Sequence, residues 1–101
     1  MKSNNPEIPL TDNKLLNYRK TIDSIDDKIL DLLVMRFSTI ESIGKYKKEN
    51  NIAVVDKNRI NQILSKAEKI AQSSGFDPKI FKNIYLTIIR SACIMEEKSD
   101  K

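Results

Sequence analysis

Apolar residues recur at intervals of three and four positions through much of the first half of the chain. The repeat consists of Ile22, Ile25, Ile29, Leu32, Ile40, Ile43 and Tyr46. Such spacing is typical of one face of an α-helix. Because no proline falls between Lys14 and Lys48, the pattern predicts a single helix of about 35 residues, which would be about 52 Å long.

A helix of this length is too long for one small domain to cover. The chain has 101 residues, and a compact domain of that size has a radius of gyration of about 13 Å. Much of the apolar face would therefore be exposed to water unless another chain covered it. We expect the long helix to pack against a partner chain.

Two shorter helices are predicted in the second half of the chain. Asn50-Asn51 ends the long helix, and Asp56 is a suitable N-cap for a helix that runs to about Ser74. Gly75 then supplies a stop, and Asp77-Pro78 has the order of a cap followed by a first helical residue. The predicted fold class is all-α, with three helices per chain and a very long first helix.

The chain suits a single domain with short extensions. Residues 1–12 contain Pro6 and Pro9 and have no apolar repeat, so we expect a flexible N-terminal arm. Residues 13–98 form the predicted helical domain, and residues 99–101 are a short tail. No apolar run approaches the roughly 18 residues of a membrane span, and the polar N-terminus lacks the apolar segment of a secretory signal. These features predict a cytoplasmic protein with no membrane partner.

Composition argues against several kinds of chemistry. The chain has no histidine and a single cysteine, Cys93, so zinc sites and Ser-His or Cys-His catalysis are not expected. We predict neither a metal nor a cofactor, and we expect Cys93 to be a small buried apolar residue. The net charge of +4 permits an anionic partner. No basic stripe with base-reading residues is present, so a nucleic-acid partner is not expected.

Arg36 interrupts the apolar repeat at a position where another core residue is expected. An arginine does not lose its charge inside a protein, so a buried one needs an anion nearby. One interpretation is a side chain that extends along apolar surface and pairs with an acid on a neighbouring helix. The other is a binding residue. Lys47 lies three turns farther along, within about 20° of the same helix face, so both side chains could contact one ligand.

Two further arginines could join this pair. Arg59 lies in the first turn of the predicted second helix, where backbone N–H groups also favour an anion. Arg19 lies about 25 Å along the long helix from Arg36, so it cannot easily reach the same ligand from the same chain. From the antiparallel helix of a partner chain it could.

At these positions the chain resembles the AroQ-class chorismate mutases, the all-helical type II family. The matching elements are Leu16-x-x-Arg19-x-x-Ile22-Asp23-x-Ile25-Asp26, Leu32-Leu33-x-x-Arg36, Ile43-Gly44-x-x-Lys47, Val55-Asp56-x-x-Arg59, Phe76-Asp77 and Ile84-Tyr85-x-x-Ile88-Ile89. They run in register from about Leu16 to Glu97. Several spaced motifs together are more specific than any one of them.

The resemblance implies an intertwined homodimer with shared active sites that rearranges chorismate to prephenate, a step of the shikimate pathway toward the aromatic amino acids. The substrate that the resemblance implies is a small dicarboxylate. Arg19 matches the arginine that the family takes from the other subunit. Arg36, Lys47 and Arg59 match cationic contacts to the substrate's carboxylates, ring hydroxyl region and ether oxygen. Asp56 matches a residue that contacts the ring hydroxyl.

Some positions that the resemblance places in the site depart from the family pattern. Ile60 replaces a glutamate that contacts the ring 4-hydroxyl, and Ala92 replaces a serine. Glu96 replaces the glutamine of bacterial members, and the same glutamate in fungal members must be protonated to donate to the ether oxygen. With Arg36 and Lys47, Glu96 completes the expected catalytic set, and we expect activity to rise toward acidic pH.

The identity of the substrate is open at this point. An aliphatic residue at the position of Ile60 also occurs in the related isochorismate-pyruvate lyases, and a third relative rearranges 4-amino-4-deoxychorismate. Chorismate mutase is the first hypothesis because Val54-Val55-Asp56 and Gly44-x-x-Lys47 match the mutases better. A mutase-like domain that binds a ligand or a partner synthase without turnover is the remaining alternative.

Overall fold

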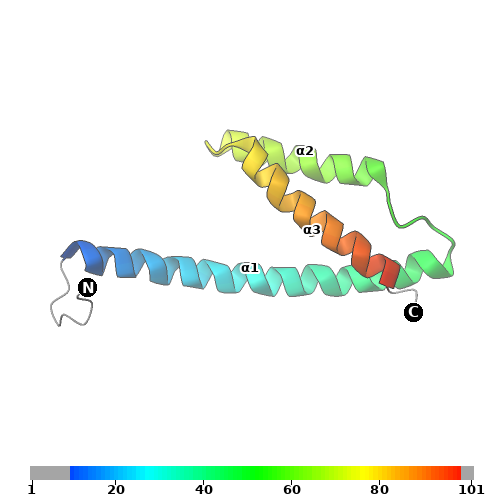
Figure 1. Cartoon of the computed structure of the whole chain (residues 1–101), viewed down its shortest axis with the longest axis horizontal. Helices are drawn as coiled ribbons and strands as arrows, with labels where there is room; N and C mark the ends of the chain where they lie inside the picture. Colours follow the sequence, from blue (N-terminus) through cyan, green and yellow to red (C-terminus); the bar gives the residue numbers. More distant parts are fainter. Residues whose placement is uncertain (1–9, 99–101) are drawn as a thin grey trace. The chain divides into compact units, whose positions relative to one another are not determined.

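The computed structural model describes residues 10–98, and within them the backbone is helical apart from two short connections. Helix α1 spans Leu10–Glu49, α2 spans Lys57–Ser73 and α3 spans Pro78–Lys98 (Figure 1). The predicted all-α class with a very long first helix is confirmed. In this part of the chain no helix has a segment long and apolar enough to cross a membrane.

The first helix begins earlier than predicted. It starts at Leu10, inside the segment that was expected to be a flexible arm and before the predicted start near Lys14. From Leu10 to Glu49 there is no proline, so every residue of α1 has a backbone N–H for the helical ladder. Residues 1–9 and 99–101, which hold most of the predicted arm and the predicted tail, lie outside the described residues.

The chain divides into two units, one ending at Met35 and the other beginning at Arg36, and α1 runs through both. In the first unit α1 is the only described element, so no other described residues of the unit cover its apolar face. Ile22 is 53% exposed and Leu32 is 61% exposed. An apolar face of this extent normally requires a partner surface.

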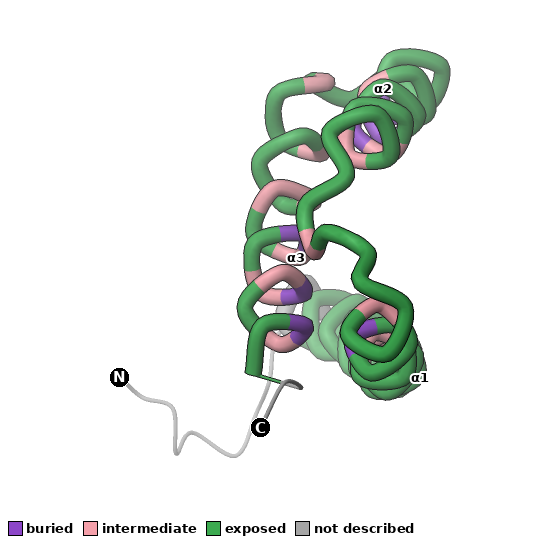
Figure 2. The backbone as a smooth tube through the Cα atoms, turned by 90° about the vertical axis from the view of Figure 1, so that its right-hand side faces the viewer, coloured by how far each residue is buried: buried purple, intermediate pink, exposed green. Residues whose placement is uncertain are grey.

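The second unit has a core between α2 and α3, which pack against one another. The buried apolar residues lie one or two turns apart on each helix (Figure 2): Leu64, Ala67 and Ala71 on α2, and Ile89 and Ala92 on α3. Small alanine side chains allow the two backbones to approach closely. Glu96 continues the buried row of α3 as its one charged member among the described residues.

Helices α1 and α2 both end in the same way. The N–H of Ile52 donates to the carbonyl of Lys47 at 2.8 Å, and Asn51 between them has a positive φ of 56°. At the end of α2 the N–H of Phe76 donates to the carbonyl of Ala71 at 2.9 Å, and Gly75 has a φ of 84°. Both ends are Schellman motifs, in which a residue in the left-handed conformation lets the backbone N–H groups that follow the helix donate to its last carbonyls.

Side-chain caps fix the other ends of α2 and α3. The backbone N–H of Arg59 donates to Asp56 Oδ1 at 3.1 Å, which confirms the predicted N-cap. In the same way the N–H of Lys79 donates to Asp77 Oδ1 at 2.9 Å, and Pro78 occupies the first position of α3. Each cap satisfies a backbone donor that has no partner within its helix.

Replacing Gly75 with alanine should lower the free energy of unfolding by about 1 kcal/mol, because a Cβ disfavours the left-handed backbone. A Cβ at this position would meet no atom within 4 Å, so the cost would come from the backbone alone. Urea unfolding at a fixed protein concentration measures the change. The control is Ser74→Ala at the adjacent position. Ser74 has a φ of −96°, so this variant should have nearly the same free energy of unfolding as wild type. Equal stability of Gly75→Ala and wild type would contradict this account of the turn.

Candidate active site

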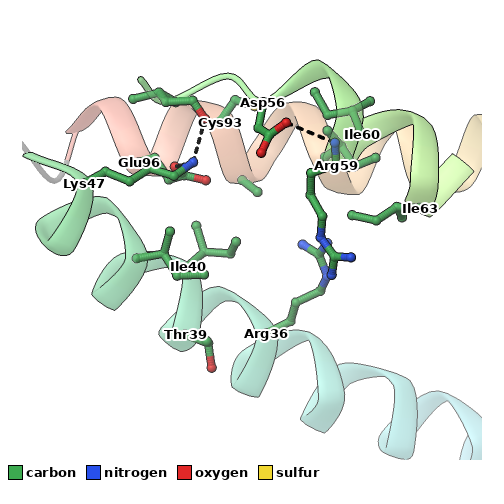
Figure 3. A pocket seen from close by; sticks show the side chains of 14 residues that line it. Arg36, Thr39, Ile40, Lys47, Asp56, Arg59, Ile60, Ile63, Cys93 and Glu96 are labelled. Carbon is green, nitrogen blue, oxygen red and sulfur yellow. Dashed lines mark hydrogen bonds and ion pairs between the residues drawn. The ribbon is translucent and has the colours of Figure 1, made fainter. Parts of the chain in front are cut away.

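A pocket of about 450 Å³ opens within the second unit, between the last turns of α1, the α1–α2 connection, the start of α2 and the end of α3 (Figure 3). Apart from Arg19, every residue predicted for the site lines this pocket. These residues are Arg36, Lys47, Asp56, Arg59, Ile60, Ala92 and Glu96. Arg19 belongs to the first unit and is not among the lining residues.

Local helix geometry explains how residues far apart in the sequence meet here. Arg36 and Lys47 lie on one face of α1 because three helical turns separate them. The Asp56 cap sets the first turn of α2, and this turn carries Arg59 and Ile60. On α3 the helical repeat places Ala92 and Glu96 one turn apart on the buried side.

Arg36 and Arg59 point toward one another across the pocket (Figure 3). The Nη1 atom of Arg36 is buried and has no hydrogen-bond partner among the described residues. The acid that a purely structural Arg36 would need is therefore not found in this part of the chain. A buried charged donor without a partner costs more than about 1–3 kcal/mol, so the arrangement indicates that an anion belongs there.

Lys47 has two partners, one hydrogen-bond acceptor and one carboxylate. Its Nζ donates to the carbonyl oxygen of Val54 at 2.7 Å and lies 2.8 Å from Glu96 Oε1. The side chain of Glu96 is only 7% exposed and that of Lys47 is 17% exposed. Glu96 Oε1 takes part in this ion pair but accepts no well-directed hydrogen bond among the described residues. The pair places an ammonium group and a carboxyl group side by side at one end of the pocket.

The two carboxylates that line the pocket already have partners. Glu96 is paired with Lys47, and Asp56 Oδ1 accepts from the backbone N–H of Arg59. Neither is paired with the guanidinium of Arg36 or Arg59 among the described residues. The positive charge of these two side chains is therefore available to an external anion.

Six of the fourteen residues that line the pocket are apolar and were not predicted for the site from the sequence. They are Ile40, Ile43, Val54, Ile63, Ile89 and Cys93, and Thr39 also lines the pocket. Helical spacing from Arg36 could have identified Ile40 and Ile43, which follow it on the same face. A low-dielectric wall strengthens every electrostatic interaction inside the pocket.

Cys93 faces this pocket and is partly exposed. Burial, and next the nearby Glu96 carboxylate, raise the pKa of the Cys93 thiol. A raised pKa keeps the thiol neutral, so Cys93 acts as a small apolar residue and is a poor nucleophile. In residues 10–98 no group of three or more histidine, cysteine, aspartate or glutamate side chains is placed to hold a metal ion.

The pocket therefore offers fixed cations, one buried carboxyl group and an apolar wall. It can bind a small dianion in a defined orientation and stabilise negative charge that develops near Lys47. None of the described residues that line it is an activated nucleophile, and its chemistry suits a reaction that needs orientation and charge stabilisation alone.

Comparison with known protein families gives one match that covers most of the chain. The sequence model of the family described as chorismate mutase type II matches residues 18–98. This range includes all of the pocket-lining residues and Arg19.

Individual relatives agree with this family match. The chain is 30% identical over 80 residues to a 4-amino-4-deoxychorismate mutase of Streptomyces pristinaespiralis, which aligns 79% of this chain and 62% of the relative's length. It is 26% identical to a 4-amino-4-deoxychorismate mutase of Streptomyces venezuelae, with 84% and 82% of the two chains aligned. It is 32% identical over 76 residues to a chorismate mutase of Methanocaldococcus jannaschii, with 75% and 77% aligned.

Replacing Lys47 with methionine should destabilise the protein by about 3 kcal/mol, because it leaves the buried Glu96 carboxylate without its cation. A Lys47→Met/Glu96→Gln double variant should recover much of this loss, since it removes both charges together. Urea unfolding of Lys47→Met, Glu96→Gln and the double variant gives the coupling free energy between the two side chains. Additive effects of the two changes would contradict the ion pair.

Proposed function

The chain belongs to the type II chorismate mutase family, and we propose that it catalyses the rearrangement of chorismate to prephenate. The observation that carries this proposal is the pair of guanidinium groups on Arg36 and Arg59, which face one pocket with no carboxylate paired to either in the described residues. Chorismate carries two carboxylates. A pocket whose own acids are engaged elsewhere is suited to such a dianion.

The reaction requires nothing that the chain lacks. In the rearrangement one C–C bond forms as the ether C–O bond breaks within a single molecule, and no proton is transferred. A chain without histidine can therefore catalyse it. The cationic side chains hold the substrate in the compact conformation that brings the reacting carbons together.

Lys47 and Glu96 provide the groups that face the breaking ether bond in this proposal. Negative charge grows on the ether oxygen as the bond breaks, and an adjacent ammonium group stabilises it. Glu96 contributes a second hydrogen bond when it is protonated. The two groups are 2.8 Å apart, so one oxygen atom can contact both.

A homodimer completes the proposed site. Arg19 lies on the part of α1 that belongs to the first unit, where the apolar face is exposed along several turns. A second chain that covers this face would bury the apolar residues, and in doing so it would supply its own Arg19 to the pocket. Each dimer would then contain two sites made from both chains.

The substrate could instead carry a different group at ring position 4. Ile60 lines the pocket and offers no hydrogen bond to a 4-hydroxyl, and Ala92 offers none either. Two of the relatives described above are named as 4-amino-4-deoxychorismate mutases. This second candidate uses the same carboxylate contacts and the same rearrangement. An isochorismate-pyruvate lyase activity at the same pocket is the remaining substrate alternative.

Separate incubations with chorismate, 4-amino-4-deoxychorismate and isochorismate, with products separated by chromatography, test the assignment. We expect prephenate from chorismate. Product from the 4-amino substrate alone would move the activity to the second candidate, and salicylate with pyruvate from isochorismate would identify a lyase. No product from any of the three would indicate a binding domain and would overturn the proposal.

Activity should rise toward acidic pH, because only a protonated Glu96 can donate to the ether oxygen. Replacing Glu96 with glutamine supplies an N–H donor that does not titrate, so Glu96→Gln should be active at neutral pH with a flatter profile. Lys47 from α1, and Cys93 and Glu97 from α3, are titratable groups near this carboxyl in the described part of the chain. Profiles of kcat/KM against pH that superimpose for the two proteins would rule out this role.

Shared sites make a prediction about mixtures of inactive variants. Arg19→Ala and Arg36→Ala homodimers should each lose most activity, whereas an equal mixture refolded together should recover roughly a quarter of the wild-type activity, since half of its dimers carry one intact site. The specific activity of the mixture measures this. A mixture no more active than the separate variants would mean that Arg19 and Arg36 do not act across a dimer.

A further inference from the structure

Gln62 lies beside the proposed site but belongs to none of the motifs described above. It sits on α2 one turn after Arg59 and lines a second cavity of about 440 Å³. This cavity shares Arg36, Arg59 and Ile63 with the first pocket. The side chain of Gln62 is exposed, so burial in a core does not explain its presence.

The amide of Gln62 contacts the binding arginine directly. Arg59 Nη1 donates to Gln62 Oε1 at 3.2 Å. A guanidinium is planar and rigid, so a hydrogen bond at one nitrogen orients the remaining donors as well. The backbone N–H of Arg59 is fixed separately by the Asp56 cap. Both ends of this residue are thereby positioned before a ligand arrives.

The chemical type of the acceptor matters because of the charges around it. The second cavity is lined by the cations Arg36, Arg59 and Lys66, and no acidic residue lines it among the described residues. A carboxylate at position 62 would hold Arg59 equally well, but it would neutralise the guanidinium and compete with a substrate carboxylate. An amide accepts the hydrogen bond and leaves the positive charge for the ligand.

We infer that Gln62 is a positioning residue, which orients the Arg59 guanidinium for a substrate carboxylate without neutralising its charge. The inference rests on the proposed function for the identity of the ligand. It concerns a residue that acts through Arg59 and does not itself touch the reacting atoms.

Two variants separate orientation from charge. Gln62→Met keeps the length of the side chain and removes the acceptor, so KM should rise about fivefold while kcat changes by less than about twofold. Gln62→Glu keeps the acceptor and adds a negative charge, so KM should rise about tenfold or more. Asn61→Leu changes a neighbouring exposed amide of α2 that lines neither of these two cavities, and it should behave as wild type.

A double variant tests whether Gln62 acts through Arg59. In an Arg59→Met background the Gln62→Met change should have no further effect on kcat/KM. A loss of the same size in both backgrounds, or a fall in kcat at unchanged KM, would overturn the inference. So would a KM of Gln62→Met that equals the KM of Asn61→Leu.

A measurement on the protein without substrate tests the orientation of Arg59 independently of catalysis. The Nε–H signal of Arg59 in ¹⁵N NMR spectra should shift toward that of a mobile arginine in Gln62→Met and stay near its wild-type position in Gln62→Glu. An unchanged signal in Gln62→Met would contradict the inference even if the enzyme is active. A shifted signal in a protein that turns over none of the three substrates would support the positioning role and refute the proposed function.

Discussion

The proposed binding site depends on the permanent charge of Arg36. Its Nη1 atom is buried without a hydrogen-bond partner in the described part of the chain, and a guanidinium cannot become neutral to relieve the cost. The two carboxylates that line the pocket are engaged by Lys47 and by the backbone N–H of Arg59. An anionic ligand would supply the counter-charge that Arg36 lacks among the described residues, and a dianion would match the charges of Arg36 and Arg59 together.

The helical framework fixes the positions of the other charged groups that line the pocket. Packing of α2 against α3 through small alanines, together with the Asp56 cap and the turn at Gly75, fixes the positions of Arg59 and Glu96. Lys47 is restrained by a backbone carbonyl of the connection as well as by Glu96. Lys47 and Arg59 are thus held by contacts that exist before substrate binds, which is the condition for electrostatic catalysis.

Local sequence signals were sufficient to predict most of the fold. The apolar repeat predicted the long α1, the proline-free run predicted that it is continuous, and Asp56 and Gly75 predicted the limits of α2. The start of α1 at Leu10 was missed because the polar residues after Pro9 carry no apolar repeat. Polar residues can also form a helix, so the point where the apolar repeat begins did not mark the first residue of α1.

The site was predictable only where it depends on one helix or on a family motif. Arg36 and Lys47 could be placed together because they share α1. The contact of Lys47 with the Val54 carbonyl and that of Arg59 with Gln62 could not be predicted. A backbone carbonyl has no sequence signature, and a surface amide resembles many others.

A crystal structure of the protein with bound prephenate would show whether Arg36 and Arg59 bind the carboxylates of the ligand. We expect one prephenate in each pocket. Its carboxylates should contact Arg36, Arg59 and an Arg19 from the second subunit, and Lys47 and Glu96 should lie at the end where the ether oxygen was before the bond broke. A ligand bound outside this pocket, or one whose carboxylates contact neither Arg36 nor Arg59, would contradict this expectation.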